Sequence, residues 1–102
     1  MEEKNLNIKD LIAYSESGVL SKVISKDENL DITLFSMAEG TEISEHTSTK
    51  KGFVYVIEGN GIFTLEGKEI KMLPGVLITM GENMVHKLKA EENTSFLLVL
   101  AK

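Results

Sequence analysis

Short apolar runs alternate with polar turns along most of this chain, from residue 19 to residue 101. Most of the turns contain glycine, and they recur about every eight to twelve residues. Such regular spacing is typical of a β-sandwich or a β-barrel. We therefore expect strands over residues 19–24, 31–37, 43–46, 53–58, 61–65, 68–72, 76–79, 85–89 and 95–101.

The segment before the first expected strand has a different pattern. Ile8, Leu11 and Ile12 recur with the spacing of one helical face, and Asn7 is a good N-cap residue. We expect one short helix over residues 7–14. The sequence thus predicts an all-β fold with a short N-terminal helix.

Two of the expected strands are apolar on both faces, over residues 53–57 and 96–100. One face of each strand packs on the core, and the other face needs a different cover. A second sheet with the N-terminal helix is one such cover, and a second copy of the chain is another. Because a domain of 102 residues has few elements of its own for this purpose, we favour a homodimer.

Length and composition indicate the class of protein. With 102 residues, of which 42% are hydrophobic and 26% charged, we expect one soluble globular domain over residues 1–102. No run approaches the roughly 20 apolar residues that cross a bilayer, and the first residues resemble neither a secretory signal nor a transit peptide. We therefore expect a cytoplasmic protein that does not contact a membrane.

Cysteine content and charge exclude several functions. The sequence has no cysteine, which excludes disulfides, thiolate metal ligands and thiol nucleophiles. All 11 positive side chains are lysines, scattered through a chain of net charge −5. Because nucleic-acid binding needs clustered positive charge, we expect no nucleic-acid partner.

Two stretches have the spacing of known motifs. In the first motif a glycine is followed by a His-any-His pair, a glutamate and a closing glycine, and Gly40, His46 and Gly59 occupy three of these places. Ser48 stands at the second histidine position, and Gly52 stands at the glutamate position. The second motif is matched by its glycine and histidine, Gly75 and His86, and departs from its usual proline, glycine and asparagine at Gly81, Asn83 and Ala90.

With these motifs the chain resembles the cupin family, from about residue 19 to the C-terminus. The resemblance implies a cupin-type double-stranded β-helix, which is a jelly-roll barrel, over about residues 19–101. It also implies that His46 and His86 lie on neighbouring strands and point into the barrel.

The resemblance further implies a metal site of three histidines and one glutamate, of which this chain keeps only His46 and His86. A divalent transition metal such as Zn, Fe, Mn or Ni needs at least three protein ligands in a site of this kind. Glu45 should face away from the pocket because adjacent strand residues face opposite sides, and the hydroxyl of Ser48 is a poor ligand. Three interpretations remain open: a hydrogen-bonded histidine pair, a two-histidine site completed by waters or an anion, and an enzymatic site whose third ligand is not evident.

We interpret the barrel interior as a pocket that binds a small organic molecule or a weakly held divalent metal. One alternative is a metal-dependent cupin enzyme of the dioxygenase or isomerase type, and another is a non-catalytic sensor or protein-interaction module. No catalytic residue can be assigned from the sequence. Methionine adapts to irregular apolar shapes and either lines the pocket or fills the core, at Met37, Met72, Met80 and Met84. The expected polar end of the pocket is His46, Ser48 and His86, and the expected walls are Val54, Val56 and Leu88.

Overall fold

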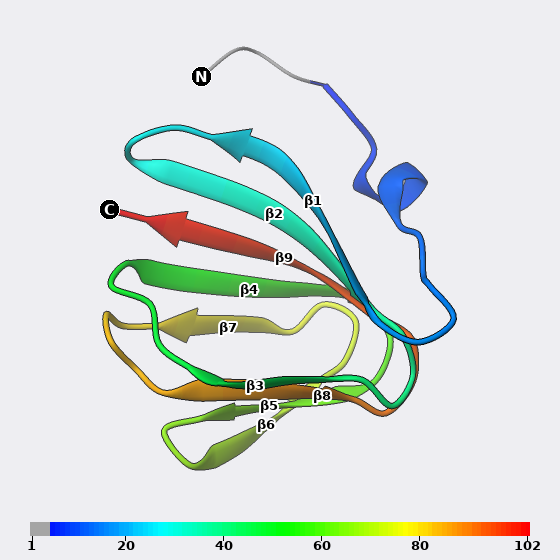
Figure 1. Ribbon diagram of the computed structural model, residues 1–102. Helices are drawn as coiled ribbons and strands as arrows, with labels where there is room; N and C mark the ends of the chain where they lie inside the picture. The colour runs from blue at the N-terminus through cyan, green and yellow to red at the C-terminus, as the bar shows by residue number, and fades with distance from the viewer. Residues whose placement is uncertain (1–4) are drawn as a thin grey trace.

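The computed structural model describes residues 5–102 as two antiparallel β-sheets packed face to face (Figure 1). One sheet has five strands in the order β1-β2-β9-β4-β7, and the other has four in the order β3-β8-β5-β6. The predicted all-β fold is confirmed. The strands are β1 (Val19–Lys26), β2 (Leu30–Met37), β3 (Glu42–His46), β4 (Lys51–Glu58), β5 (Gly61–Leu65), β6 (Lys68–Met72), β7 (Leu77–Met80), β8 (His86–Ala90) and β9 (Thr94–Ala101).

The chain passes repeatedly from one sheet to the other. It crosses between β2 and β3, between β3 and β4, and again at each later connection except the hairpin from β5 to β6. Most neighbouring strands are consequently distant in sequence, as with β2 and β9, which pair along their whole length. This connectivity is that of a jelly-roll barrel, as the resemblance implied.

The predicted N-terminal helix over residues 7–14 is wrong in type and length. Only a 3₁₀ turn, η1 (Ile8–Leu11), forms, and Ile12 is already extended. Asn7 does cap the turn, because its side chain accepts a hydrogen bond from the Lys9 N–H at 3.0 Å. No helix in the described part of the chain is both long and apolar enough to cross a membrane. Residues 1–4, the start of the segment in which no signal peptide was expected, lie outside the described residues.

Tertiary contacts explain why the helix stops early. The Tyr14 hydroxyl donates a hydrogen bond to Glu58 at 2.7 Å and lies 2.6 Å from the Ser95 hydroxyl oxygen. Burial is the main cause that raises the pKa of Tyr14 to about 12, so the phenol keeps its proton. These bonds hold Tyr14 against β4 and β9 of the five-stranded sheet. A helix of eight residues has little stability of its own, so these tertiary contacts determine the conformation of the segment.

The core lies between the two sheets and follows strand alternation. On β4, Gly52, Val54 and Val56 are buried, whereas Phe53 and Tyr55 between them are exposed. The same alternation buries the inward residues of β8. The three expected wall residues are all buried on the inner side of their strands: Val54, Val56 and Leu88. The core cluster consists of Met37, Val54, Val56, Phe63, Met72, Ile78, Met80, Leu88, Ala90 and Phe96.

Candidate functional site

A β-bulge in β3 turns His46 toward the barrel interior. Ile43 pairs with Leu88 and His46 pairs with His86, so three residue steps along β3 match two steps along β8. Regular alternation from Ile43, which packs against the core, would have sent Glu45 inward and His46 outward. The extra residue reverses these two orientations, as bulges do.

The two histidines form one polar cluster at an end of the barrel. Their ring centroids lie 4.0 Å apart with an angle of 61° between the planes. His86 is only 6% exposed, and its other side stacks on the Phe63 ring at a centroid distance of 5.7 Å. His46 is exposed and lies at the mouth. The predicted juxtaposition of the two rings is therefore present.

Hydrogen bonds to the backbone orient both rings in the same way. His46 Nδ1 lies 2.8 Å from the Ser44 carbonyl oxygen, and His86 Nδ1 lies 3.0 Å from the Met84 carbonyl oxygen. Because a carbonyl can only accept, each Nδ1 carries the hydrogen, and each neutral ring keeps its lone pair on Nε2. This is the tautomer in which histidine donates to a ligand through Nε2.

The electrostatic environment favours a neutral ring at His86. Burial lowers the pKa of His86 most strongly, the backbone hydrogen bond to Met84 opposes this shift, and the neighbouring His46 adds to it. A lowered pKa keeps His86 uncharged at neutral pH, when its Nε2 can accept a proton or bind an electron-pair acceptor.

The histidines lie at the polar end of a cavity of about 70 Å³ between the sheets. Four of the six predicted pocket residues line it: His46, Val54, His86 and Leu88. Sequence reasoning missed several inward-facing apolar residues, which strand parity could have identified once the pairing was known. The other lining residues are Phe35, Ile43, Phe63, Met80, Phe96 and Leu98.

The two remaining predicted residues lie elsewhere. Val56 is fully buried in the core and does not line the cavity. Ser48 lies in the loop between β3 and β4, where its hydroxyl accepts a hydrogen bond from the Lys50 N–H at 3.2 Å. Its carbonyl accepts one from the Asn83 N–H at 2.7 Å, which ties this loop to the loop before β8. Ser48 thus stabilises the rim rather than the lining.

The residues present do not fit the divalent metal site that the resemblance implies. A side chain at Gly52, the glutamate position, would place its Cβ 2.6 Å from Met80 Cε and 3.4 Å from Leu100 Cδ2. Met80 therefore already fills the space that the carboxylate would need. Across residues 5–102, no group of three or more histidine, cysteine, aspartate or glutamate side chains is arranged to hold a metal ion.

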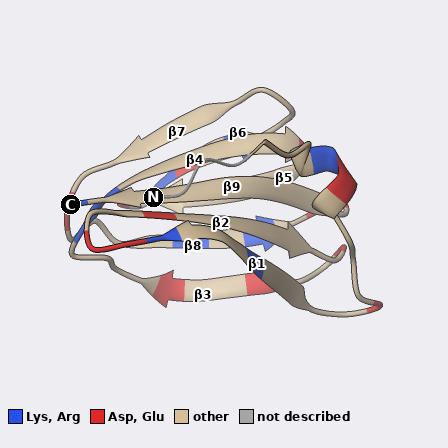
Figure 2. Cartoon of the chain, turned by 90° about the horizontal axis from the view of Figure 1, so that it is seen from above, with Lys and Arg blue, Asp and Glu red and all other residues tan. Residues whose placement is uncertain are grey.

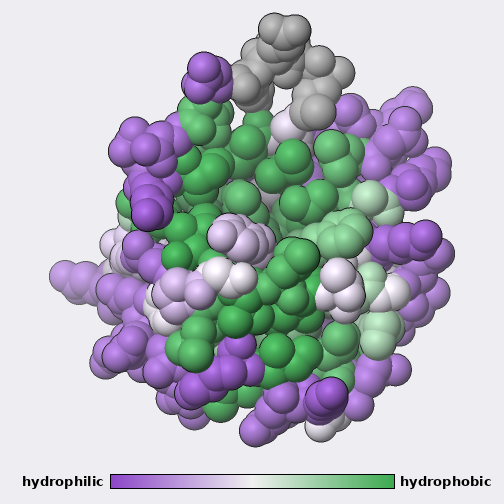
Figure 3. All heavy atoms as spheres, turned by 180° about the vertical axis from the view of Figure 1, so that it is seen from behind, coloured by the Kyte–Doolittle hydropathy of each residue, from purple (hydrophilic) through white to green (hydrophobic). Residues whose placement is uncertain are grey.

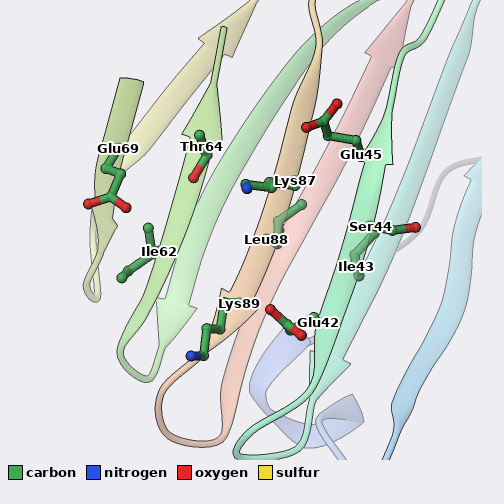
Figure 4. A pocket seen from close by; sticks show the side chains of 10 residues that line it. All are labelled: Glu42, Ile43, Ser44, Glu45, Ile62, Thr64, Glu69, Lys87, Leu88 and Lys89. Atoms are coloured by element: carbon green, nitrogen blue, oxygen red, sulfur yellow. The ribbon is translucent and has the colours of Figure 1, made fainter. Parts of the chain in front are cut away.

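A larger hollow, of about 500 Å³, lies on the outer face of the four-stranded sheet (Figure 4). It contains Glu45, which the bulge turns outward, and it carries charges of both signs. Glu42 on β3 lies opposite Lys89 on β8, and Lys87 lies opposite Thr64 on β5 (Figure 4). Neither histidine lines this hollow, whereas both line the cavity between the sheets, which is therefore the candidate site.

Comparisons with known proteins agree with this architecture. A family model described as "Cupin domain" matches residues 33–101. A sequence search of curated proteins finds no match. A conserved protein of unknown function from Streptococcus pyogenes is similar in structure, with a TM-score of 0.89 and 27% sequence identity over 100% of this chain and 90% of that one.

Two further solved structures share the fold. A cupin superfamily protein from Desulfitobacterium hafniense has a TM-score of 0.89 and 22% identity over 99% of this chain and 93% of that chain. Salicylate 1,2-dioxygenase (G106A mutant) from Pseudoaminobacter salicylatoxidans, solved in complex with gentisate, has a TM-score of 0.78 and 18% identity, over 82% of this chain but only 25% of the enzyme. From the family match over most of its length and its jelly-roll topology, this chain belongs to the cupin family.

Proposed function

We propose that this cupin protein binds a small ligand between its sheets through His46 and His86. The observation that carries the proposal is the pair of histidine rings, each with its lone pair on Nε2, among the otherwise apolar described residues that line the cavity. Such a pair accepts hydrogen bonds from a hydroxyl or amine, or binds a metal ion weakly. We infer a small organic molecule as the ligand, because no third histidine, cysteine or carboxylate joins the two histidines among the described residues to hold a divalent metal.

Cavity size limits the ligand. Small-molecule pockets usually measure about 300–1,000 Å³, whereas the space here is about 70 Å³. One water molecule accounts for about 30 Å³ of the liquid. The space therefore accepts a compact molecule or the end of a longer one, with its polar group at the histidines. A cupin-fold dioxygenase has been solved with the organic acid gentisate, which supports an organic ligand here.

Phenol and benzene form a matched pair of probes for this site. Both rings are apolar, but only phenol donates a hydrogen bond. We expect phenol to bind about fivefold more tightly than benzene, since a hydrogen bond to a buried acceptor adds roughly 1 kcal/mol. Histidine ¹⁵N NMR during each titration should show the Nε2 resonances shifting with phenol only.

Two variants make this test specific. His86→Phe should abolish the preference for phenol, whereas Ser48→Ala should leave it unchanged because Ser48 lies outside the cavity lining. Equal affinities for phenol and benzene in the wild-type protein, or unmoved histidine resonances, would refute the proposal. Loss of phenol binding in Ser48→Ala would return Ser48 to the site.

We also infer a homodimer that forms through the outer face of the five-stranded sheet. Phe53, Tyr55 and Leu77 are 40%, 46% and 59% exposed there, and Tyr55 pairs directly with Leu77 across β4 and β7. Seen from the side of β4 and β7, the surface has a broad apolar area with charged side chains around it (Figure 3). Apolar centres with charged rims are typical of protein interfaces.

A charge placed in this area should dissociate the dimer. We expect Leu77→Lys to convert a dimer into a monomer in light scattering coupled to size-exclusion chromatography, because an unpaired charge would be desolvated in the interface. Val85→Lys is the matched control: Val85 is 39% exposed but precedes β8 on the other sheet. A wild-type protein that runs as a monomer at all concentrations would contradict the inference.

We expect no nucleic-acid or membrane partner. The lysines of β8 lie beside the carboxylates of the neighbouring β3, so negative charge accompanies the positive charge on this sheet (Figure 2). Net charge of −5 adds a general repulsion from phosphate backbones.

A further inference from the structure

The cavity contains a third donor atom that is neither nitrogen nor oxygen. Met80, at the end of β7, lines the cavity together with His46 and His86. It is buried, and its terminal methyl lies next to the backbone of Gly52, its partner on β4. The thioether therefore belongs to a side chain that lines the same cavity as the two imidazoles.

The topology brings these three side chains to one end of the barrel. β3 ends at His46, β7 ends at Met80 and β8 begins at His86. These strand ends lie on the same side of the molecule (Figure 1). The absence of a side chain at Gly52 gives Met80 room to lie there, since any Cβ would displace it.

The donor set is soft and uncharged. Two imidazole nitrogens and one thioether contain no carboxylate, and no carboxylate lines the cavity. Thioether ligands select Cu(I) over the hard divalent ions that prefer carboxylates. The desolvation cost of an ion grows with the square of its charge, so a monovalent ion costs roughly one quarter as much as a divalent one in this apolar space.

We propose that His46 Nε2, His86 Nε2 and Met80 Sδ form a binding site for a Cu(I) ion. The inference rests on the proposed function to the extent that both use the same Nε2 atoms. It adds Met80 as a ligand. It selects Cu(I) because the three donors are soft and uncharged and because a monovalent ion costs less to desolvate. It also explains how two histidines without a carboxylate can make a metal site.

The test is an anaerobic titration of the full chain with Cu(I) in the presence of bicinchoninate, a competing chromophoric chelator. We expect one Cu(I) per chain. Met80→Leu keeps the side-chain volume but removes the sulfur, and we expect it to weaken Cu(I) binding about tenfold or more. Met72→Leu is the matched control, because Met72 is an equally buried methionine that does not line the cavity.

X-ray absorption at the copper edge gives a second measurement that does not depend on a variant. A sulfur neighbour in the wild-type spectrum supports the site, and a spectrum with nitrogen and oxygen neighbours alone overturns it. Failure of the wild-type chain to bind Cu(I), or equal affinity in Met80→Leu, also overturns it. Phenol binding separates this inference from the proposed function: if the histidine resonances respond to phenol but no Cu(I) binds, only the copper site is lost.

Discussion

A chain that carries both Gly52→Glu and Met80→Ala is expected to bind Zn²⁺ roughly 100-fold more tightly than the wild-type protein. Zinc sites use at least three protein ligands. Loss of a residue that only hydrogen-bonds to a metal ligand already changes the metal affinity by about 10–100-fold. The Gly52 backbone faces inward, and Met80 Cε lies 2.6 Å from the place of a Cβ there. Removing Met80 gives the new carboxylate access to His46 and His86. Isothermal titration calorimetry measures the affinity.

Each single variant serves as a control for the pair. Met80→Ala leaves a cavity and should cost about 3 kcal/mol of folding free energy, with Zn²⁺ still held by two histidines only. Gly52→Glu by itself forces the carboxylate against Met80, so its Zn²⁺ affinity should stay well below that of the double variant. If the double variant binds Zn²⁺ no better than Met80→Ala, then position 52 does not face the imidazoles.

Gly59→Ala is expected to lower the free energy of unfolding by about 3 kcal/mol and the thermal midpoint by about 15 °C. Gly59 has φ of +111°, which strains any residue with a Cβ. That Cβ would also lie 2.5 Å from Asn93 O, Thr94 Cα and Thr94 Oγ1. Two of these atoms are backbone, so they cannot rotate away. Thermal unfolding followed by circular dichroism measures the change.

Gly67→Ala isolates the backbone strain. Gly67 has φ of +80°, but nothing lies within 4 Å of a Cβ at that position. We expect the free energy of unfolding to fall by only about 1 kcal/mol and the thermal midpoint by about 5 °C. If Gly59→Ala and Gly67→Ala lower the free energy of unfolding equally, the turn before β5 shifts freely. Its contact with the start of β9 would then contribute little to stability.

Strand alternation made most of the fold predictable. Val54 and Leu88 point inward because successive residues of a strand face opposite sides, and the structure has this alternation on both β4 and β8. Polar turns, most of which contain glycine, placed every expected strand within a few residues of its observed position. The single domain over residues 1–102 and the cytoplasmic location stay predictions.

The failures arose where distant contacts override local pattern. The helix over residues 7–14 became a short turn because Tyr14 is held by Glu58 and Ser95, which lie far away in sequence. Ser48 was assigned to the pocket by counting from His46, but the loop hydrogen-bonds to itself and to Asn83 instead. Met80 was only one of four methionines considered, and its place beside Gly52 depends on the pairing of β4 with β7.

The sequence by itself determined the alternation of strands and turns, the residue types that can donate to a ligand, and the loss of two of the four metal-ligand positions. Those properties are local, because they depend on spacing and side-chain chemistry. Only the tertiary structure decided that a bulge turns His46 toward His86 and that Met80 fills the space beside Gly52. Strand register and side-chain packing depend on residues that are distant in sequence, and no local pattern encodes which strands become neighbours.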